Sequence, residues 1–147
     1  MSLKNLDNLV DHGVLKREPG DQKEFDSLVD LGRKKLNDAA NDTLAEESQF
    51  DLAYNAAHAL SLAAMRWHGY RPDKTRYVVF QTLSDTLGLK PEQWRILDKS
   101  HNARNLAEYQ GAIDIDPKLL SGLIEVTRVV LKAIEKLGAV PKSKPTS

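Results

Sequence analysis

The stretch from Glu46 to His68, EESQFDLAYNAAHALSLAAMRWH, decides the fold class. It is rich in alanine, with that residue at positions 53, 56, 57, 59, 63 and 64. Its larger side chains lie along one stripe that drifts slowly around a helix: Phe50, Tyr54, His58, Leu62 and Met65. Because small residues let neighbouring helices approach closely, this pattern predicts the central helix of a bundle. Capping-box spacing of Thr43 with Glu46, repeated by Ser48 with Asp51, predicts its start.

Two helices are predicted on the N-terminal side of this stretch. The first is expected to have Ser2 as its N-cap and to stop at His12-Gly13. The second is expected from near Asp21 to about Asn41, with a buried side made of Phe25, Leu28, Val29, Leu31 and Leu36. Residues 16–20, Lys-Arg-Glu-Pro-Gly, form the predicted turn between the two helices.

On the C-terminal side, residues 71–73 are predicted as a loop, and a fourth helix follows from Asp73 or Thr75 to Gly88. A helix first turn at Pro91 leads to a short helix over 100–111. The dipeptide Asp116-Pro117 predicts the start of the last helix, which ends at Gly138. No strand-like alternation exceeds a few residues.

These segments together predict an all-α protein, an up-and-down helical bundle of four principal helices plus short accessory helices. Residues 1–138 are expected to form one domain, and the polar, proline-broken residues 139–147 a flexible C-terminal tail. The length of 147 residues, with 41% hydrophobic and 29% charged residues, suits a single globular domain.

The composition also argues against several classes of function. A net charge of zero disfavours a dedicated duplex-DNA binder. The chain has no cysteine, which excludes disulfides, thiolate catalysis and zinc–thiolate sites. No apolar run is long enough for a membrane span and no signal-peptide core is visible, so a cytoplasmic protein without membrane contact is predicted.

The polar chemistry is concentrated in Ser100–Gly111, SHNARNLAEYQG. Four polar side chains fall at i, i+3, i+4 and i+7 and share one helical stripe: His101, Arg104, Asn105 and Glu108. The small or apolar residues beside them are expected to turn inward: Ala103, Leu106 and Ala107. The plain alternative is a solvated helix face with internal ion pairs.

Other catalytic motifs are missing from the sequence. It has no glycine-rich phosphate loop and no His-Glu-x-x-His, and its four histidines have no carboxylates at metal-ligand spacing. No metal and no cofactor are therefore predicted. His58, four residues after Tyr54, is either a buried, hydrogen-bonded histidine or a site residue.

The motif Arg104-Asn-x-Ala-Glu-Tyr109, preceded by His101, resembles the signature of the HEPN superfamily (higher eukaryotes and prokaryotes nucleotide-binding domain). It is similar to the prokaryotic branch with Arg-Asn-x-Ala-(Asp/Glu)-Tyr. Residues 46–72, a helix of small residues followed by Gly-Tyr-Arg-Pro, resemble the same branch, as does the segment from Leu9 to Leu15 followed by the Lys-Arg-Glu-Pro turn and a long helix. The likeness covers residues 3 to 135, nearly the whole chain.

The resemblance implies a homodimeric module that binds a nucleotide, RNA or a partner protein. It also implies a toxin–antitoxin or defence pair, in which the partner is a minimal nucleotidyltransferase. HEPN ribonucleases carry Arg, four to six residues, then His, whereas Tyr109 stands where that His is expected. Because tyrosine is a poor base at neutral pH, the module is predicted to be catalytically silent. The expected ligand-binding residues are His101, Arg104, Asn105, Glu108 and Tyr109.

The alternative is a metal-independent HEPN endoribonuclease, an RNA-cleaving toxin with its site at a dimer interface. It would use His101 with Arg104, or Arg95 with His101, whose spacing formally satisfies the family rule although Arg95 is expected in the turn before the helix. The imidazole would act as general base and the guanidinium would stabilise phosphate charge. A purely structural helical dimer is the third possibility. The deciding feature is whether His101 lies in a cleft beside Arg104 or is held by Glu108 and the core.

Overall fold

The computed structural model describes residues 3–111 and 115–142, without the side chains of Tyr109 and Gln110. Over these residues the chain forms seven helices and one two-stranded sheet, so the predicted all-α helical bundle is confirmed. The four long helices are α2 (Gln22–Ala39), α3 (Glu46–Trp67), α6 (Pro91–Gln110) and α7 (Pro117–Glu135). The short helices are α1 (Lys4–Asp11), α4 (Val78–Gln81) and α5 (Leu83–Thr86).

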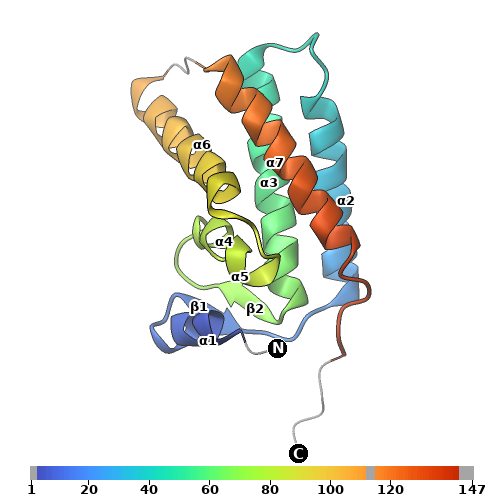
Figure 1. Ribbon diagram of the computed structural model, residues 1–147. Helices are drawn as coiled ribbons and strands as arrows, with labels where there is room; N and C mark the ends of the chain where they lie inside the picture. The colour runs from blue at the N-terminus through green and yellow to red at the C-terminus, as the bar shows by residue number, and fades with distance from the viewer. Residues whose placement is uncertain (1–2, 112–114, 143–147) are drawn as a thin grey trace, which may run out of the picture.

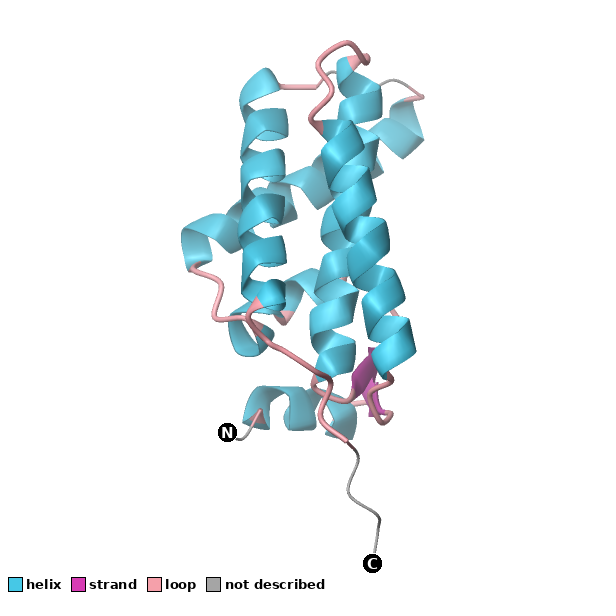
Figure 2. Ribbon diagram, turned by 90° about the vertical axis from the view of Figure 1, so that its right-hand side faces the viewer, coloured by secondary structure: helices cyan, strands magenta, loops and turns pink. Residues whose placement is uncertain are grey.

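Helix α3 is the centre of the bundle, as its alanine-rich sequence predicted. It packs against α2 and α7, which also contact each other, and α6 packs on α7 (Figure 1). The view turned by 90° shows the long helices side by side and α1 across the end of the bundle (Figure 2). All six alanines between Ala53 and Ala64 are buried. The close approach is tightest at Gly32 of α2, where an added Cβ would lie 2.5 Å from Leu60 of α3.

A small antiparallel sheet is the main departure from the predicted secondary structure. Strand β1 (Leu15–Arg17) pairs with β2 (Tyr70–Pro72), with Leu15 opposite Pro72. The sequence had predicted a turn from Lys16 and a loop from Arg71, and both predictions were wrong. Three-residue strands are too short to show a period of two, so only their tertiary pairing identifies them.

Beside this sheet, a partly buried ion network centred on Arg66 connects the end of α3 to the start of α2. Arg66 is 2% exposed, and its Nε donates to Glu24 Oε1 at 2.6 Å. Its other nitrogens donate to the carbonyls of Glu18 and Pro19, each at 2.8 Å. Arg71 donates to Glu18 Oε2 and Glu24 Oε2, each at 2.6 Å. Burial raises the pKa of Glu24, but the hydrogen bonds from Arg71 and Arg66 outweigh it and hold that pKa below its ordinary value.

The helix boundaries and faces need several corrections. Residues 91–111 do not form a first turn and a separate short helix, because α6 is continuous from Pro91 and Arg95 lies inside it. The predicted fourth helix is instead the two short helices α4 and α5. Leu31 and Leu106, both expected inside, are 45% and 56% exposed.

The predicted cap was right at the start of α7 and wrong at the start of α3, and α2 starts beside Asp21 as expected. Asp21 and Asp116 accept hydrogen bonds from backbone nitrogens of the first turns of α2 and α7. The start of α3 has Ala45 as its N-cap and no side-chain cap, which contradicts both capping boxes. The expected Ser2 cap lies outside the described residues, and α1 begins after Leu3.

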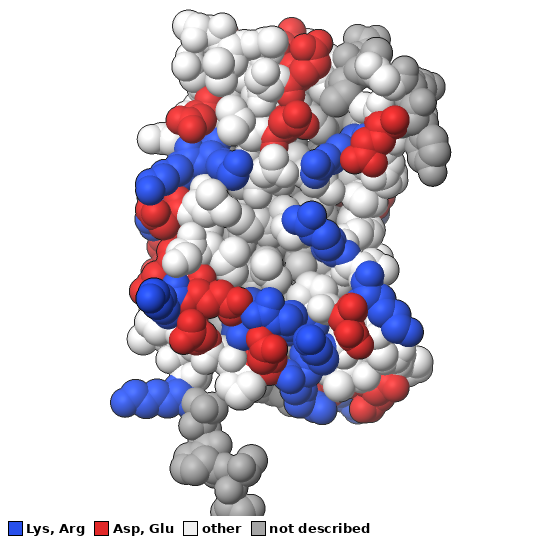
Figure 3. Space-filling view, turned by 180° about the vertical axis from the view of Figure 1, so that it is seen from behind, with Lys and Arg blue, Asp and Glu red and all other residues white. Residues whose placement is uncertain are grey.

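The first residues of the predicted tail are tied to the bundle. The Val140 nitrogen donates to Gln22 Oε1 at 2.7 Å, and Trp67 Nε1 donates to the Gly138 carbonyl at 3.2 Å. Residues 143–147 lie outside the described part of the chain. Acidic and basic side chains are interspersed over the face seen from behind, in agreement with the net charge of zero (Figure 3).

Candidate functional site

A pocket of about 170 Å³ brings the predicted stripe of α6 together with α3 and the turn before α4. Its lining residues come from these three segments: Tyr54, His58, Arg76, Tyr77, His101, Arg104, Asn105 and Glu108. Four of the five predicted ligand-binding residues therefore lie around one cavity, and the fifth, Tyr109, has a side chain outside the described part of the structure. Tyr54 and His58, which the sequence could not place relative to this stripe, face it.

His101 is held in the pocket through both ring nitrogens. Asn105 Nδ2 donates to Nε2 at 3.0 Å, so the proton of the neutral ring is on Nδ1, which donates to Tyr54 Oη at 3.0 Å. Burial and the charge of Arg104 lower the pKa of His101, although Asp98 and Glu108 act in the opposite direction. The histidine is therefore held by Tyr54 and Asn105, not by Glu108 as one sequence-based alternative had it.

Tyr77 orients the same imidazole from the turn before α4. Its ring stacks on His101 with 3.9 Å between ring centroids and 24° between the planes. Its hydroxyl donates to Asp98 Oδ1, one turn before His101 on α6. Burial, followed by this hydrogen bond, raises the pKa of Tyr77, so the tyrosine stays protonated at neutral pH. His101 is thus fixed by contacts from three segments and does not move freely.

Two arginines supply positive charge to the pocket. The guanidinium carbon of Arg104 lies 4.5 Å from the centre of the Tyr54 ring, in a cation–π contact. Its distance to Glu108 is 4.0 Å, at the limit of an ion pair, and the Glu108 side chain is largely exposed. Arg76 is exposed and makes no ion pair with any residue that the structure describes. Neither guanidinium is therefore neutralised by a close carboxylate.

The imidazole ring of His58 also lines the pocket and is more buried than that of His101. It lies edge-on to Phe80, with 6.0 Å between centroids. Its Nε2 is buried and has no hydrogen-bond partner among the described residues, while a backbone hydrogen bond with Arg76 acts on the pKa of the ring. Burial, followed by the charge of Arg76, lowers the pKa of His58 to about 4. The ring is neutral at physiological pH.

Sequence reasoning missed Arg76 and misplaced Tyr77. Arg76 was not singled out because a lone arginine in a turn carries no periodic or motif signal. Tyr77 was read as an apolar helix position, whereas it precedes α4 as its N-cap. Arg95, the other candidate arginine, is exposed on α6 and does not line this pocket.

The histidine pKa values predict acid-sensitive stability. Unfolding returns His58 to its ordinary pKa of 6.5, so between pH 6.5 and about 4 the unfolded chain binds a proton that the folded chain excludes. Stability is therefore expected to fall as the pH drops through this window. His68 and His101, whose pKa values burial also lowers, contribute in the same direction.

The measurement is the urea midpoint of unfolding as a function of pH. His58→Gln removes one titrating group and is expected to flatten the dependence between pH 6.5 and about 4. The control is His12→Gln at an exposed position. An identical slope for His58→Gln and wild type would contradict the assignment of the buried, neutral imidazole.

Comparisons with protein-family models, curated proteins and solved structures found no match to this chain. Within residues 3–111 and 115–142, no helix combines the length and apolar character that crossing a membrane requires. The same residues contain no group of three or more His, Asp or Glu side chains arranged to hold a metal ion.

Proposed function

We propose that this protein is a nucleotide- or RNA-binding module whose pocket between α3 and α6 holds a phosphate group of the ligand. The observation that carries the proposal is the convergence of Arg76 and Arg104 on one pocket, whose lining carboxylate, Glu108, is largely exposed and lies 4.0 Å from Arg104. An arginine fork matches the oxygens of a phosphate, and two such groups provide charge-assisted hydrogen bonds.

The neutral side chains of the pocket support a phosphate ligand in a second way. Because His101 donates to Tyr54 Oη, the tyrosine hydroxyl keeps its own proton for a ligand. Burial raises the pKa of Tyr54, so this donor persists at neutral pH. A donor-rich, cationic pocket with aromatic walls favours an anion that carries rings, such as a nucleotide or single-stranded RNA.

Binding without cleavage is favoured over the ribonuclease alternative by the state of His101. Both its ring nitrogens are used inside the protein, so acting as a general base would first require Nε2 to release Asn105. Tyr109 in place of the expected motif histidine points the same way. We therefore propose a catalytically silent member of a HEPN-like class. Two predictions rest on the sequence resemblance alone and stay predictions. One is that the protein forms a homodimer, and the other is that its partner in a toxin–antitoxin or defence pair is a minimal nucleotidyltransferase.

The test is binding of a fluorescein-labelled single-stranded RNA, measured by anisotropy. Arg104→Ala is expected to weaken binding by about tenfold or more, because a hydrogen bond to a charged group contributes roughly 1.5–3 kcal/mol. Arg76→Ala should weaken it similarly, and each variant should reduce the salt dependence by the equivalent of about one phosphate contact. The control is Arg128→Ala, on the exposed side of α7, where Arg128 pairs only loosely with Glu125.

The same RNA incubated with wild type in EDTA separates binding from cleavage. An intact RNA is expected. Cleavage that disappears in His101→Ala and in Arg104→Ala would overturn the silent module in favour of the metal-independent ribonuclease. If wild type and Arg104→Ala bind the RNA with equal affinity, this pocket does not hold a phosphate group of the ligand.

A further inference from the structure

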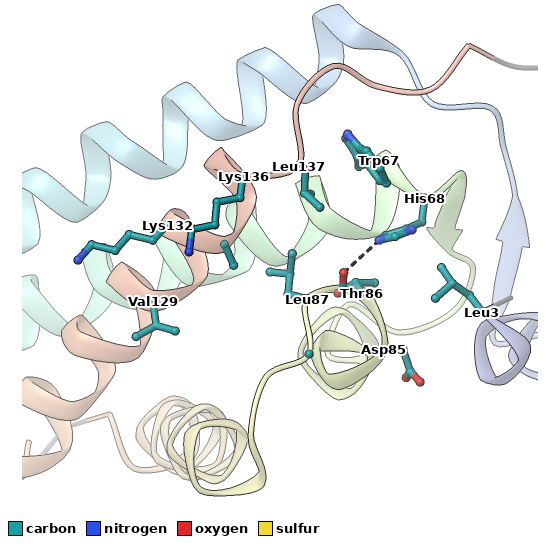
Figure 4. A pocket seen from close by; sticks show the side chains of 12 residues that line it. Leu3, Trp67, His68, Asp85, Thr86, Leu87, Val129, Lys132, Lys136 and Leu137 are labelled. Carbon is teal, nitrogen blue, oxygen red and sulfur yellow. Dashed lines mark hydrogen bonds between the residues drawn. The ribbon is translucent and has the colours of Figure 1, made fainter. Parts of the chain in front are cut away.

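A second and larger pocket lies on another part of the molecule. It has a volume of about 840 Å³ and is enclosed by the end of α3, helix α5 with the residues after it, and the last turns of α7 (Figure 4). It shares no lining residue with the arginine pocket. Its volume falls within the range of about 300–1,000 Å³ that is typical of sites for small molecules.

The walls of this pocket are apolar. Figure 4 shows Leu87, Val129 and Leu137 around the opening, with Trp67 beyond them. All four side chains are partly exposed and pack against the core cluster, so they form a hydrophobic surface that water still reaches. A ligand with an apolar chain would remove this surface from water, which is the main driving force for binding in such a site.

Two lysines at the C-terminal end of α7 stand at one rim, one in its last turn and one directly after its last residue. Lys132 and Lys136 are one helical turn apart, and neither forms an ion pair with a described residue. Glu135, the acidic residue between them, pairs with Arg33 on the other side of the helix. In Figure 4 the ammonium group of Lys136 lies closer to the apolar walls than that of Lys132. This rim therefore offers uncompensated positive charge next to a hydrophobic cavity.

The pocket also contains a buried hydroxyl without a partner. Thr86 is 6% exposed, and its Oγ1 makes no hydrogen bond with any described residue. His68 does not satisfy it, because His68 Nε2 donates to the backbone carbonyl of Thr86 at 3.1 Å. The acidic group of the pocket, Asp85, is already engaged by Asn5 Nδ2 at 2.9 Å. A buried hydroxyl is expected to have a partner, and a polar group of a bound molecule would become that partner if the side chains covering Oγ1 shift on binding.

We propose that this pocket binds a small amphipathic carboxylate: an apolar chain with a carboxylate at one end and a hydroxyl or carbonyl group at the other. The carboxylate would lie at Lys136 and Lys132, the chain against Leu87, Val129 and Leu137, and the far polar group at Thr86. Charge complementarity at the rim selects an anion over a neutral lipid, and the unpartnered hydroxyl selects a chain with a polar end. The site stands independently of the phosphate pocket.

The test uses three matched probes and calorimetry: ω-hydroxydecanoate, decanoate and decanol. Wild type is expected to bind ω-hydroxydecanoate with one site per chain, decanoate more weakly and decanol most weakly. The double variant Lys132→Ala/Lys136→Ala should weaken both carboxylates by about fivefold to tenfold, as expected for part-exposed charge contacts, and leave decanol unchanged. Lys118→Ala, an exposed lysine at the other end of α7, is the control.

Two further variants examine the cavity itself. Thr86→Val keeps the shape of the side chain, and it should abolish the preference for ω-hydroxydecanoate over decanoate. Ala133→Phe fills the pocket and should abolish binding of all three probes, with unchanged far-UV circular dichroism showing that the bundle is folded. If neither carboxylate binds wild type, or if both bind the double lysine variant and Ala133→Phe as they bind wild type, the proposal is wrong.

Discussion

Replacing Arg66 with alanine is expected to destabilise the protein by about 1–3 kcal/mol, the cost of leaving the acceptors of a buried donor without a partner. The cost stays below that of a fully buried ion pair, because the Glu24 side chain is 31% exposed and keeps its contact with Arg71. The substitution leaves the Glu24 carboxylate without its 2.6 Å contact, and it leaves the carbonyls of Glu18 and Pro19 without a donor. The free energy of unfolding from urea denaturation measures the effect. Because stabilities of small domains are only about 5–15 kcal/mol, this loss is a large fraction of the total and should clearly lower the urea midpoint.

Arg66→Lys and Arg128→Ala provide the controls. Lysine keeps the charge but cannot reproduce the planar fork that reaches Glu24 and two carbonyls at once, so it should recover only part of the loss. Arg128→Ala removes an exposed arginine and should change stability by less than about 1 kcal/mol. A loss for Arg66→Ala no greater than that for Arg128→Ala would show that the network contributes nothing to the fold.

Gly32→Ala is the second substitution with a large expected effect. The sign of the change in the free energy of unfolding shows whether helix propensity or overpacking dominates at this position. In an exposed helix, alanine is more stabilising than glycine by up to about 1 kcal/mol. At position 32 the new Cβ would lie 2.5 Å from Leu60 Cγ and Cδ2, and Leu60 is fully buried. Overpacking of this kind costs about 1–3 kcal/mol, so the midpoint of urea unfolding should fall.

A double-mutant cycle with Leu60→Ala tests the cause. Leu60→Ala alone should cost about 2–5 kcal/mol, but adding Gly32→Ala to it should be neutral or stabilising because the clashing atoms are gone. Gly122→Ala on α7 is the matched control, since its Cβ would meet Ile96 at an ordinary 3.5 Å. Additive losses in the cycle would mean that the close approach of α2 to α3 is not what requires glycine.

The parts of the fold that could be predicted are those with local signals. Asp21 and Asp116-Pro117 mark helix starts by their own chemistry, and the alanine-rich stretch marks α3 as the central helix. The continuity of α6 could not be predicted, because its apolar residues follow no single stripe from Pro91 to Gln110. The β1–β2 pairing depends on contacts between distant segments and has no local signal.

The residues of the candidate site also fall into a group that the sequence could predict and a group that it could not. His101, Arg104, Asn105 and Glu108 could be grouped from helical spacing, since that spacing places them on one face. Their partners Tyr54, His58, Arg76 and Tyr77 come from two other segments, and only the packing of α3, α4 and α6 brings them near. The deeper apolar pocket at the end of α7 had no sequence signal, because its leucines and valine read as ordinary core positions.

The short β1–β2 ribbon has a consequence for the order in which the chain folds. It joins residues 15–17 to residues 70–72, so the whole α2–α3 hairpin lies inside the loop that it closes. Closing a long loop in an unfolded chain costs entropy that three residue pairs cannot offset, whereas the packing of α2 on α3 involves nearer neighbours along the chain. Once the two helices are packed, the strand partners are already close, so their pairing costs little further entropy. The ribbon therefore slows unfolding of a formed hairpin and does not start its folding.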